Sequence, residues 1–135
     1  MNRKLNSGMT LVELLVVVMI VGILASIAVP SYRAYIIRAN RTDAKTTLMA
    51  TAAALERCYS QYRMYDSASC TVSEDFASND GKYQITMERD ANTFTLTATP
   101  QEAQADDTGC GNFTLDQANV KGKSGTKALA ECWGK

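Results

Sequence analysis

Apolar residues dominate the chain from Leu14 to Tyr32, a run of 19 residues without a charged side chain. An α-helix of this length is about 28 Å long, close to the roughly 30 Å hydrocarbon thickness of a bilayer. Arg3 and Lys4 precede the run, and positive charge there holds that end in the cytoplasm. The pattern predicts a helix that crosses a membrane once, and an uncleaved signal peptide or a plain anchor would share these flanks.

The helical pattern continues beyond the apolar run. Apolar side chains follow one another at steps of seven, four and three along one side of a helix: Ile37, Ala44, Leu48, Ala52, Leu55, Tyr59 and Tyr62. We therefore expect one helix from about Met9 to Gln61, with weak points that allow a kink at Gly22 and Pro30. The other, solvent-facing side is expected to carry Arg38, Arg41, Asp43, Lys45 and Glu56.

After the helix the pattern changes to a period of two. Residues 66–81 are rich in Ser, Asp and Asn and predict a loop. Two alternating runs flank the turn Asp90-Ala91-Asn92 and predict an antiparallel hairpin with one buried face, ending at Pro100. Its inward residues are Tyr83, Ile85, Met87, Phe94, Leu96 and Ala98. We expect a polar crossover over 101–109, a third strand over 112–116, a fourth around Val120, and a loop from Lys121 to Lys127.

Composition narrows the function. The 135 residues allow one small domain beyond the apolar helix, and 14 basic residues balance 14 acidic ones, so there is no global attraction to nucleic acid or anionic lipid. The chain has no histidine, which removes the usual general base and the commonest metal ligand. We therefore predict a protein that is not an enzyme and uses no cofactor.

The four cysteines all follow the apolar run, on the side predicted to lie outside the cytoplasm, where disulfides form. They are Cys58, Cys70, Cys110 and Cys132. Three pairings are open, of which pairs of sequence neighbours are the simplest. Spacings of 12, 40 and 22 residues do not suit a zinc site. A calcium site would draw on Asp80, Asp90, Asp106 or Asp107, but these lack EF-hand spacing, and Asp106 and Asp107 are expected to lie in a loop without a partner. No metal is predicted.

Two features argue against a plain anchor. Ala25-Ser26-Ile27-Ala28 is a poor signal-peptidase site with Pro30 close behind, and Glu13 places a carboxylate at the start of the apolar run. The segment Gly8-Met9-Thr10-Leu11-Val12-Glu13 resembles the class III leader of type IV prepilins. The resemblance implies that a prepilin peptidase cuts after Gly8 and that Met9 becomes an N-methylated terminus. Cleavage would remove Arg3 and Lys4, and Glu13 would pair with a neighbouring subunit's N-terminal amine and set axial register.

The likeness extends along nearly the whole chain. Arg41-Thr42-Asp43-Ala44-Lys45, Leu55 to Tyr59, Thr95 to Pro100, Gln104, Asp107, Phe113 to Asp116 and Cys132-Trp133 resemble PilE-class minor pilins. This implies the α+β type IV pilin fold, with a long N-terminal α-helix packed on a small antiparallel β-sheet and a disulfide-closed C-terminal D-region. The expected domains are a leader (1–8), a transmembrane and filament-core half-helix (9–32) and a globular pilin domain (33–135).

The resemblance implies a structural subunit of a type IV pilus, a PilE-like minor pilin in pilus assembly, twitching motility and adhesion. Its expected partners are major and minor pilins, the prepilin peptidase and the inner-membrane assembly machinery. It would span the inner membrane once, N-terminus cytoplasmic, and then enter the extracellular pilus. One alternative is a competence minor pilin that binds DNA through Lys121, Lys123 and Lys127. Another is a pseudopilin of a type II secretion system.

Overall fold

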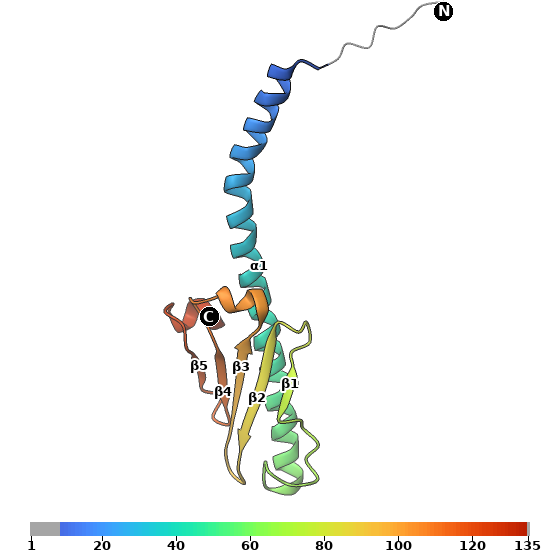
Figure 1. Cartoon of the computed structure of the whole chain (residues 1–135). Helices are drawn as coiled ribbons and strands as arrows, with labels where there is room; N and C mark the ends of the chain where they lie inside the picture. Colours follow the sequence, from blue (N-terminus) through green and yellow to red (C-terminus); the bar gives the residue numbers. More distant parts are fainter. Residues whose placement is uncertain (1–8, 135) are drawn as a thin grey trace, which may run out of the picture. The chain divides into compact units, whose positions relative to one another are not determined.

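The computed structural model describes residues 9–134 (Figure 1). Contacts divide the chain into two units, the first ending at Ile36 and the second beginning at Ile37, and each is described by itself. The elements are α1 (Leu11–Tyr62), β1 (Asp75–Ala77), β2 (Tyr83–Arg89), β3 (Phe94–Pro100), the 3-10 helix η1 (Glu102–Asp106), β4 (Phe113–Asp116), β5 (Lys121–Lys123) and α2 (Leu129–Trp133). The predicted leader and Gly8 lie outside the described residues.

The first unit contributes only the beginning of α1. The helix is assigned without a break through Gly22 and Pro30, and every residue from 9 to 35 is exposed. By length and composition α1 contains one segment apolar enough to cross a membrane. The kink at Gly22 and Pro30 stays a prediction.

The second unit is an antiparallel sheet packed on the remainder of α1. The strands follow the order β1-β2-β3-β4-β5, each antiparallel to the next (Figure 1). Alternate residues of β2, β3 and β4 are buried, as period two requires, and they form one core with Ala44, Leu48 and Leu55 of α1. The predicted α+β class, with a long helix packed on a small antiparallel sheet, is confirmed.

Two disulfides close segments of this unit. Cys58 near the end of α1 bonds to Cys70 in the following loop, with an S–S distance of 2.02 Å, and Cys110 bonds to Cys132 in α2, at 2.01 Å. Both join cysteines that are neighbours in the sequence. The second bridge closes a segment that contains β4 and β5.

The structure corrects four local predictions. Arg41 and Asp43 are 6% and 5% exposed, so they belong to the buried side of α1 and not to its solvent side. The predicted loop 66–81 contains strand β1, because Asp75–Ala77 pair with β2. Residues 121–123 form strand β5 inside the predicted loop 121–127, and α2 follows where none was expected. Asp107 has a partner, which we describe below.

Candidate functional site

The first candidate region is the start of α1, where Thr10 and Glu13 bond to each other. The hydroxyl oxygen of Thr10 accepts a hydrogen bond from the Glu13 N–H at 3.3 Å, and Glu13 Oε2 accepts one from the Thr10 N–H at 3.5 Å. This is a capping box, which satisfies two helix N–H groups that have no partner within the helix. The spacing Thr-x-x-Glu signals the capping box in the sequence, whereas the sequence interpretation assigned Glu13 only to a neighbouring subunit's amine. Pairing of Glu13 with a neighbour's amine stays a prediction.

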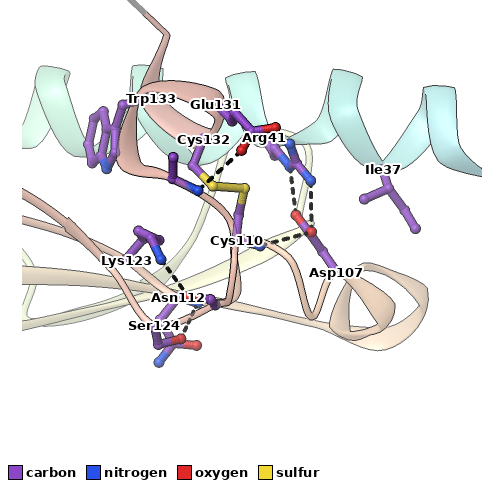
Figure 2. Close-up of a disulfide and its surroundings, with 12 residues drawn as sticks. Ile37, Arg41, Asp107, Cys110, Asn112, Lys123, Ser124, Glu131, Cys132 and Trp133 are labelled. Atoms are coloured by element: carbon purple, nitrogen blue, oxygen red, sulfur yellow. Dashed lines mark hydrogen bonds and ion pairs between the residues drawn. A yellow bond between two sulfur atoms is a disulfide. The ribbon is translucent and has the colours of Figure 1, made fainter.

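The second candidate region centres on a buried ion pair between α1 and the segment after η1 (Figure 2). Arg41 Nε and Nη2 donate to the two carboxylate oxygens of Asp107 at 2.7 and 2.8 Å, and the Cys110 N–H donates to Asp107 Oδ1 at 3.2 Å. Burial opposes ionisation of Asp107, but these two donors outweigh it and lower its pKa. The hydrogen bond to Asp107 likewise raises the pKa of Arg41 against the effect of burial. The pair holds the disulfide-closed segment beside α1.

Gln104 reinforces the same junction. Its side-chain oxygen accepts from Asn40 Nδ2 at 3.0 Å, and its Nε2 donates to the Ile37 carbonyl at 3.1 Å and to the Tyr83 hydroxyl at 2.9 Å. Burial raises the pKa of Tyr83 to about 12, although the bond from Gln104 acts in the opposite direction. One amide therefore joins α1, η1 and β2.

Asp43 organises the chain before β2. Its carboxylate accepts a hydrogen bond from the Ser78 hydroxyl and another from the Asp80 N–H at 3.1 Å. Ser78 Oγ in turn accepts from the Tyr83 N–H at 2.9 Å. A charged side chain that we expected in solvent thus anchors the loop that leads into the sheet.

The three lysines proposed for DNA contact do not share one environment. Lys121 and Lys123 pair across β4–β5 with Leu115 and Phe113, so they lie on the same face of the sheet as the core and are half-buried. The Lys121 ammonium lies 5.4 Å from the centre of the Trp133 ring, and Lys123 Nζ donates to the Gly125 carbonyl. Lys127 is exposed.

A fourth cation, which sequence reasoning assigned to solvent, joins this group. Lys45 of α1 is half-buried, and its pKa is lowered by burial and then by the positive charges of Arg41 and Lys121. Because Lys45 and Lys121 are 76 positions apart in the sequence, the effect of Lys121 on the pKa of Lys45 depends on the fold of the second unit.

Across residues 9–134, no three His, Cys, Asp or Glu side chains gather as a metal site would require. Of the acids considered for calcium, Asp107 binds Arg41, and Asp90 accepts hydrogen bonds from Asn92 and Thr93 in its own turn.

Similar proteins identify the family of this chain. A family model described as "Type IV minor pilin ComP, DNA uptake sequence receptor" matches residues 30–114, and the "Prokaryotic N-terminal methylation motif" matches residues 3–29. The chain is 33% identical over 85 residues to fimbrial protein EcpC of Eikenella corrodens, covering 62% of this chain and 54% of EcpC. It is 33% identical over 98 residues to the type IV major pilin protein PilE of Neisseria gonorrhoeae, covering 70% of this chain and 58% of PilE.

The matched parts thus span little more than half the length of these two relatives. The crystal structure of the non-core minor pilin PilV of Neisseria meningitidis superposes with a TM-score of 0.53 at 23% identity, covering 70% of this chain and 92% of PilV, which supports the fold. With a family model matching well over half of its residues, the chain belongs to the type IV minor pilin family that the ComP model describes.

Proposed function

We propose that this protein is a structural subunit of a type IV pilus, a PilE-like minor pilin in pilus assembly, twitching motility and adhesion. The observation that carries the proposal is the state of residues 9–35, which are all exposed although the run 14–32 is apolar and uncharged. A water-exposed face of this size is unstable in an isolated protein, so the helix requires lipid or other apolar helices around it. A filament subunit uses both, first the membrane and then the helices of its neighbours.

The proposed pathway begins with cleavage between Gly8 and Met9 by a prepilin peptidase, followed by methylation of Met9. Cleavage removes Arg3 and Lys4, which otherwise hold the N-terminus in the cytoplasm. The match of residues 3–29 to the N-terminal methylation motif supports this step. The subunit then leaves the inner membrane for the pilus on the cell surface, where its second unit faces water.

In the filament, Glu13 pairs with the N-terminal amine of a neighbouring subunit, because two buried opposite charges together cost far less than either alone. The capping box raises a competing explanation, in which Glu13 serves only its own helix. Substitutions can distinguish the two roles, because capping needs an oxygen acceptor whereas pairing needs a negative charge.

The test uses three variants of the full chain. Glu13→Gln keeps the acceptor and removes the charge, Glu13→Ala removes both, and Thr10→Ala removes a capping oxygen but keeps the charge. We expect all three in the membrane fraction, while the two Glu13 variants are absent from sheared filaments and Thr10→Ala is present. Normal incorporation of Glu13→Gln would contradict the pairing.

A second candidate function is capture of DNA, which the ComP family match and the lysines of the D-region support. Three phosphate contacts from Lys121, Lys123 and Lys127 would give weak binding that declines steeply with salt. The experiment is a gel shift of the full chain in detergent at low and moderate salt, with Lys127→Ala compared with Lys82→Ala as a control of equal charge. Absence of a shift at low salt would end this candidate.

A further inference from the structure

The apolar run of α1 ends at three residues, Tyr32, Arg33 and Tyr35, which we call the tyrosine–arginine band. Tyr32 and Tyr35 are 66% and 62% exposed, and Arg33 is exposed as well. The two tyrosines are three positions apart and therefore share one face of the helix, whereas Arg33 lies on another side. Each of the three side chains has an apolar stem or ring and a polar tip.

The band lies one bilayer thickness away from the charge at the other end of the run. No residue between Glu13 and Arg33 is charged, and α1 is continuous over this range. A rise of about 1.5 Å per residue places the two charges about 30 Å apart along the helix axis. The hydrocarbon layer of a typical bilayer is also about 30 Å thick. When Glu13 lies at one membrane surface, Arg33 therefore lies at the level of the opposite headgroups.

The polar groups of the band have no partner within residues 9–134. Arg33 takes part in neither ion pair of these residues, and the hydroxyls of Tyr32 and Tyr35 form no hydrogen bond with them. The helix offers Arg33 no acid, because the four residues one turn away are all apolar: Val29, Pro30, Ile36 and Ile37. A counter-charge for this guanidinium must come from outside the described part of the chain.

The chemistry of the band matches the phosphate layer of a membrane. A guanidinium binds phosphate oxygens through two parallel hydrogen bonds, which an ammonium cannot reproduce. Tyrosine is enriched where a helix leaves the hydrocarbon, because its ring lies against lipid while its hydroxyl reaches water. Water alone would solvate Arg33, but it would leave two aromatic rings exposed, which is unfavourable. Arginine and tyrosines thus favour the same layer.

We propose that Tyr32, Arg33 and Tyr35 bind phospholipid headgroups in the leaflet opposite Glu13 and fix the depth of α1 in the bilayer. Arg33 holds a lipid phosphate, and the two rings lie beside the ends of the acyl chains. The inference rests on the membrane stage of the proposed function. Once cleavage has removed Arg3 and Lys4, this band is the remaining basic anchor at the end of the run, and the subunit must release it to enter a filament.

Solid-state NMR of the full chain tests the phosphate contact. The guanidinium carbons of arginine are labelled with ¹³C, and the protein is placed in vesicles of phosphatidylethanolamine and phosphatidylglycerol in a phosphate-free buffer. Lipid is then the only source of ³¹P, so carbon–phosphorus dephasing reports contact between arginine and headgroups. We expect dephasing in the wild type, a fall of about twofold or more in Arg33→Gln, and no change in Arg57→Gln, which removes another exposed charge of α1. Dephasing that is absent from the wild type or unchanged in Arg33→Gln would overturn the proposal.

Fluorescence quenching tests the depth. Tyr32→Trp in a Trp133→Phe background leaves a single tryptophan, at the band. We expect lipids brominated near the headgroup to quench it more than lipids brominated near the chain ends. Adding Arg33→Gln should raise the ratio of deep to shallow quenching about twofold, because the charge no longer holds the helix at the surface, and adding Arg57→Gln should leave the ratio unchanged. A ratio insensitive to Arg33→Gln would contradict the role in depth.

A separate measurement distinguishes this inference from the pilus function. The wild-type chain is quantified in sheared filaments from cells. Its absence there contradicts the pilus function, while the vesicle experiments still decide the lipid contact. Its presence in filaments, together with dephasing that does not depend on Arg33, contradicts only this inference.

Discussion

The two halves of α1 differ in the side chains that they bury: the first half exposes its apolar side chains, and the second half buries several polar ones. Residues 11–35 are mostly apolar and all exposed, whereas the later half buries Arg41, Asp43, Thr47 and Thr51 beside Ala44, Leu48 and Leu55. In the first half the side chains are exposed, and under the proposed pilus function lipid or neighbouring helices would cover them. In the second half the groups that satisfy the side chains lie inside the chain, in η1, the sheet and the loop before β2.

The difference teaches that one continuous helix can serve two kinds of partner. The apolar half needs only a nonpolar environment, which has no fixed geometry. The buried polar half needs specific partners at hydrogen-bond distance, because an unpaired buried charge is costly. The first half can therefore exchange one environment for another, whereas the second is held to one fold.

The largest expected effect comes from breaking the buried ion pair. Asp107→Leu should lower the free energy of unfolding of the second unit by about 3–5 kcal/mol, because it leaves the Arg41 guanidinium buried without its carboxylate. Urea unfolding of the full chain in detergent, followed by the fluorescence of Trp133, measures it. The double variant Arg41→Met/Asp107→Leu should recover much of the loss, and equal losses in the two variants would contradict this account.

A charge placed in the apolar half of α1 should reduce membrane insertion and leave the stability of the second unit unchanged. Ile23→Lys places an ammonium near the middle of the span, which costs about 2.5–3.5 kcal/mol in the bilayer. We expect less protein in the membrane fraction and in filaments, with Ile23→Leu as the control. The unfolding free energy of the second unit should stay within about 0.5 kcal/mol of wild type, and a larger change would show that the halves are not independent.

Acid should weaken the second half through Asp107. Its pKa is lowered in the folded protein, so its contribution to stability is present above its unfolded pKa of about 4 and is lost as the pH falls through the folded value. Urea unfolding at pH 6 and below pH 4 measures the change. Asp90 has a lowered pKa too and acts in the same direction, but the Arg41→Met/Asp107→Leu variant retains Asp90. An unchanged pH dependence in that variant would contradict the role of Asp107.

The smallest expected effect compares two buried threonines on adjacent turns. Thr47 Oγ1 is buried without a hydrogen-bond partner among the described residues, whereas Thr51 Oγ1 donates to the Thr47 carbonyl at 2.8 Å. Thr47→Val should therefore raise the unfolding free energy by up to about 1 kcal/mol, and Thr51→Val should lower it by about 1 kcal/mol. Thermal unfolding of both variants in the same detergent tests the opposite signs.

Local pattern was sufficient for the helix and the three central strands. Period-two alternation identified the inward residues of β2 and β3, such as Tyr83 and Phe94, because exposure alternates along any half-buried strand. The same reasoning failed for Arg41 and Asp43. A prediction that places every charged side chain in solvent misses a buried charge. The counter-charge or the hydrogen-bond donors of such a residue come from a segment distant in the sequence, which the local pattern does not reveal.

The sequence by itself determined the apolar run, the acid at Glu13, the α+β class and the four cysteines, because each depends on residue type and short-range spacing. Only the tertiary structure decided that Asp107 meets Arg41, that Gln104 joins α1, η1 and β2, and that a groove lies between α1 and the β4–β5 turn. These features join residues far apart in the chain. Their distances follow from how the sheet packs on α1, and local periodicity carries no information about that packing.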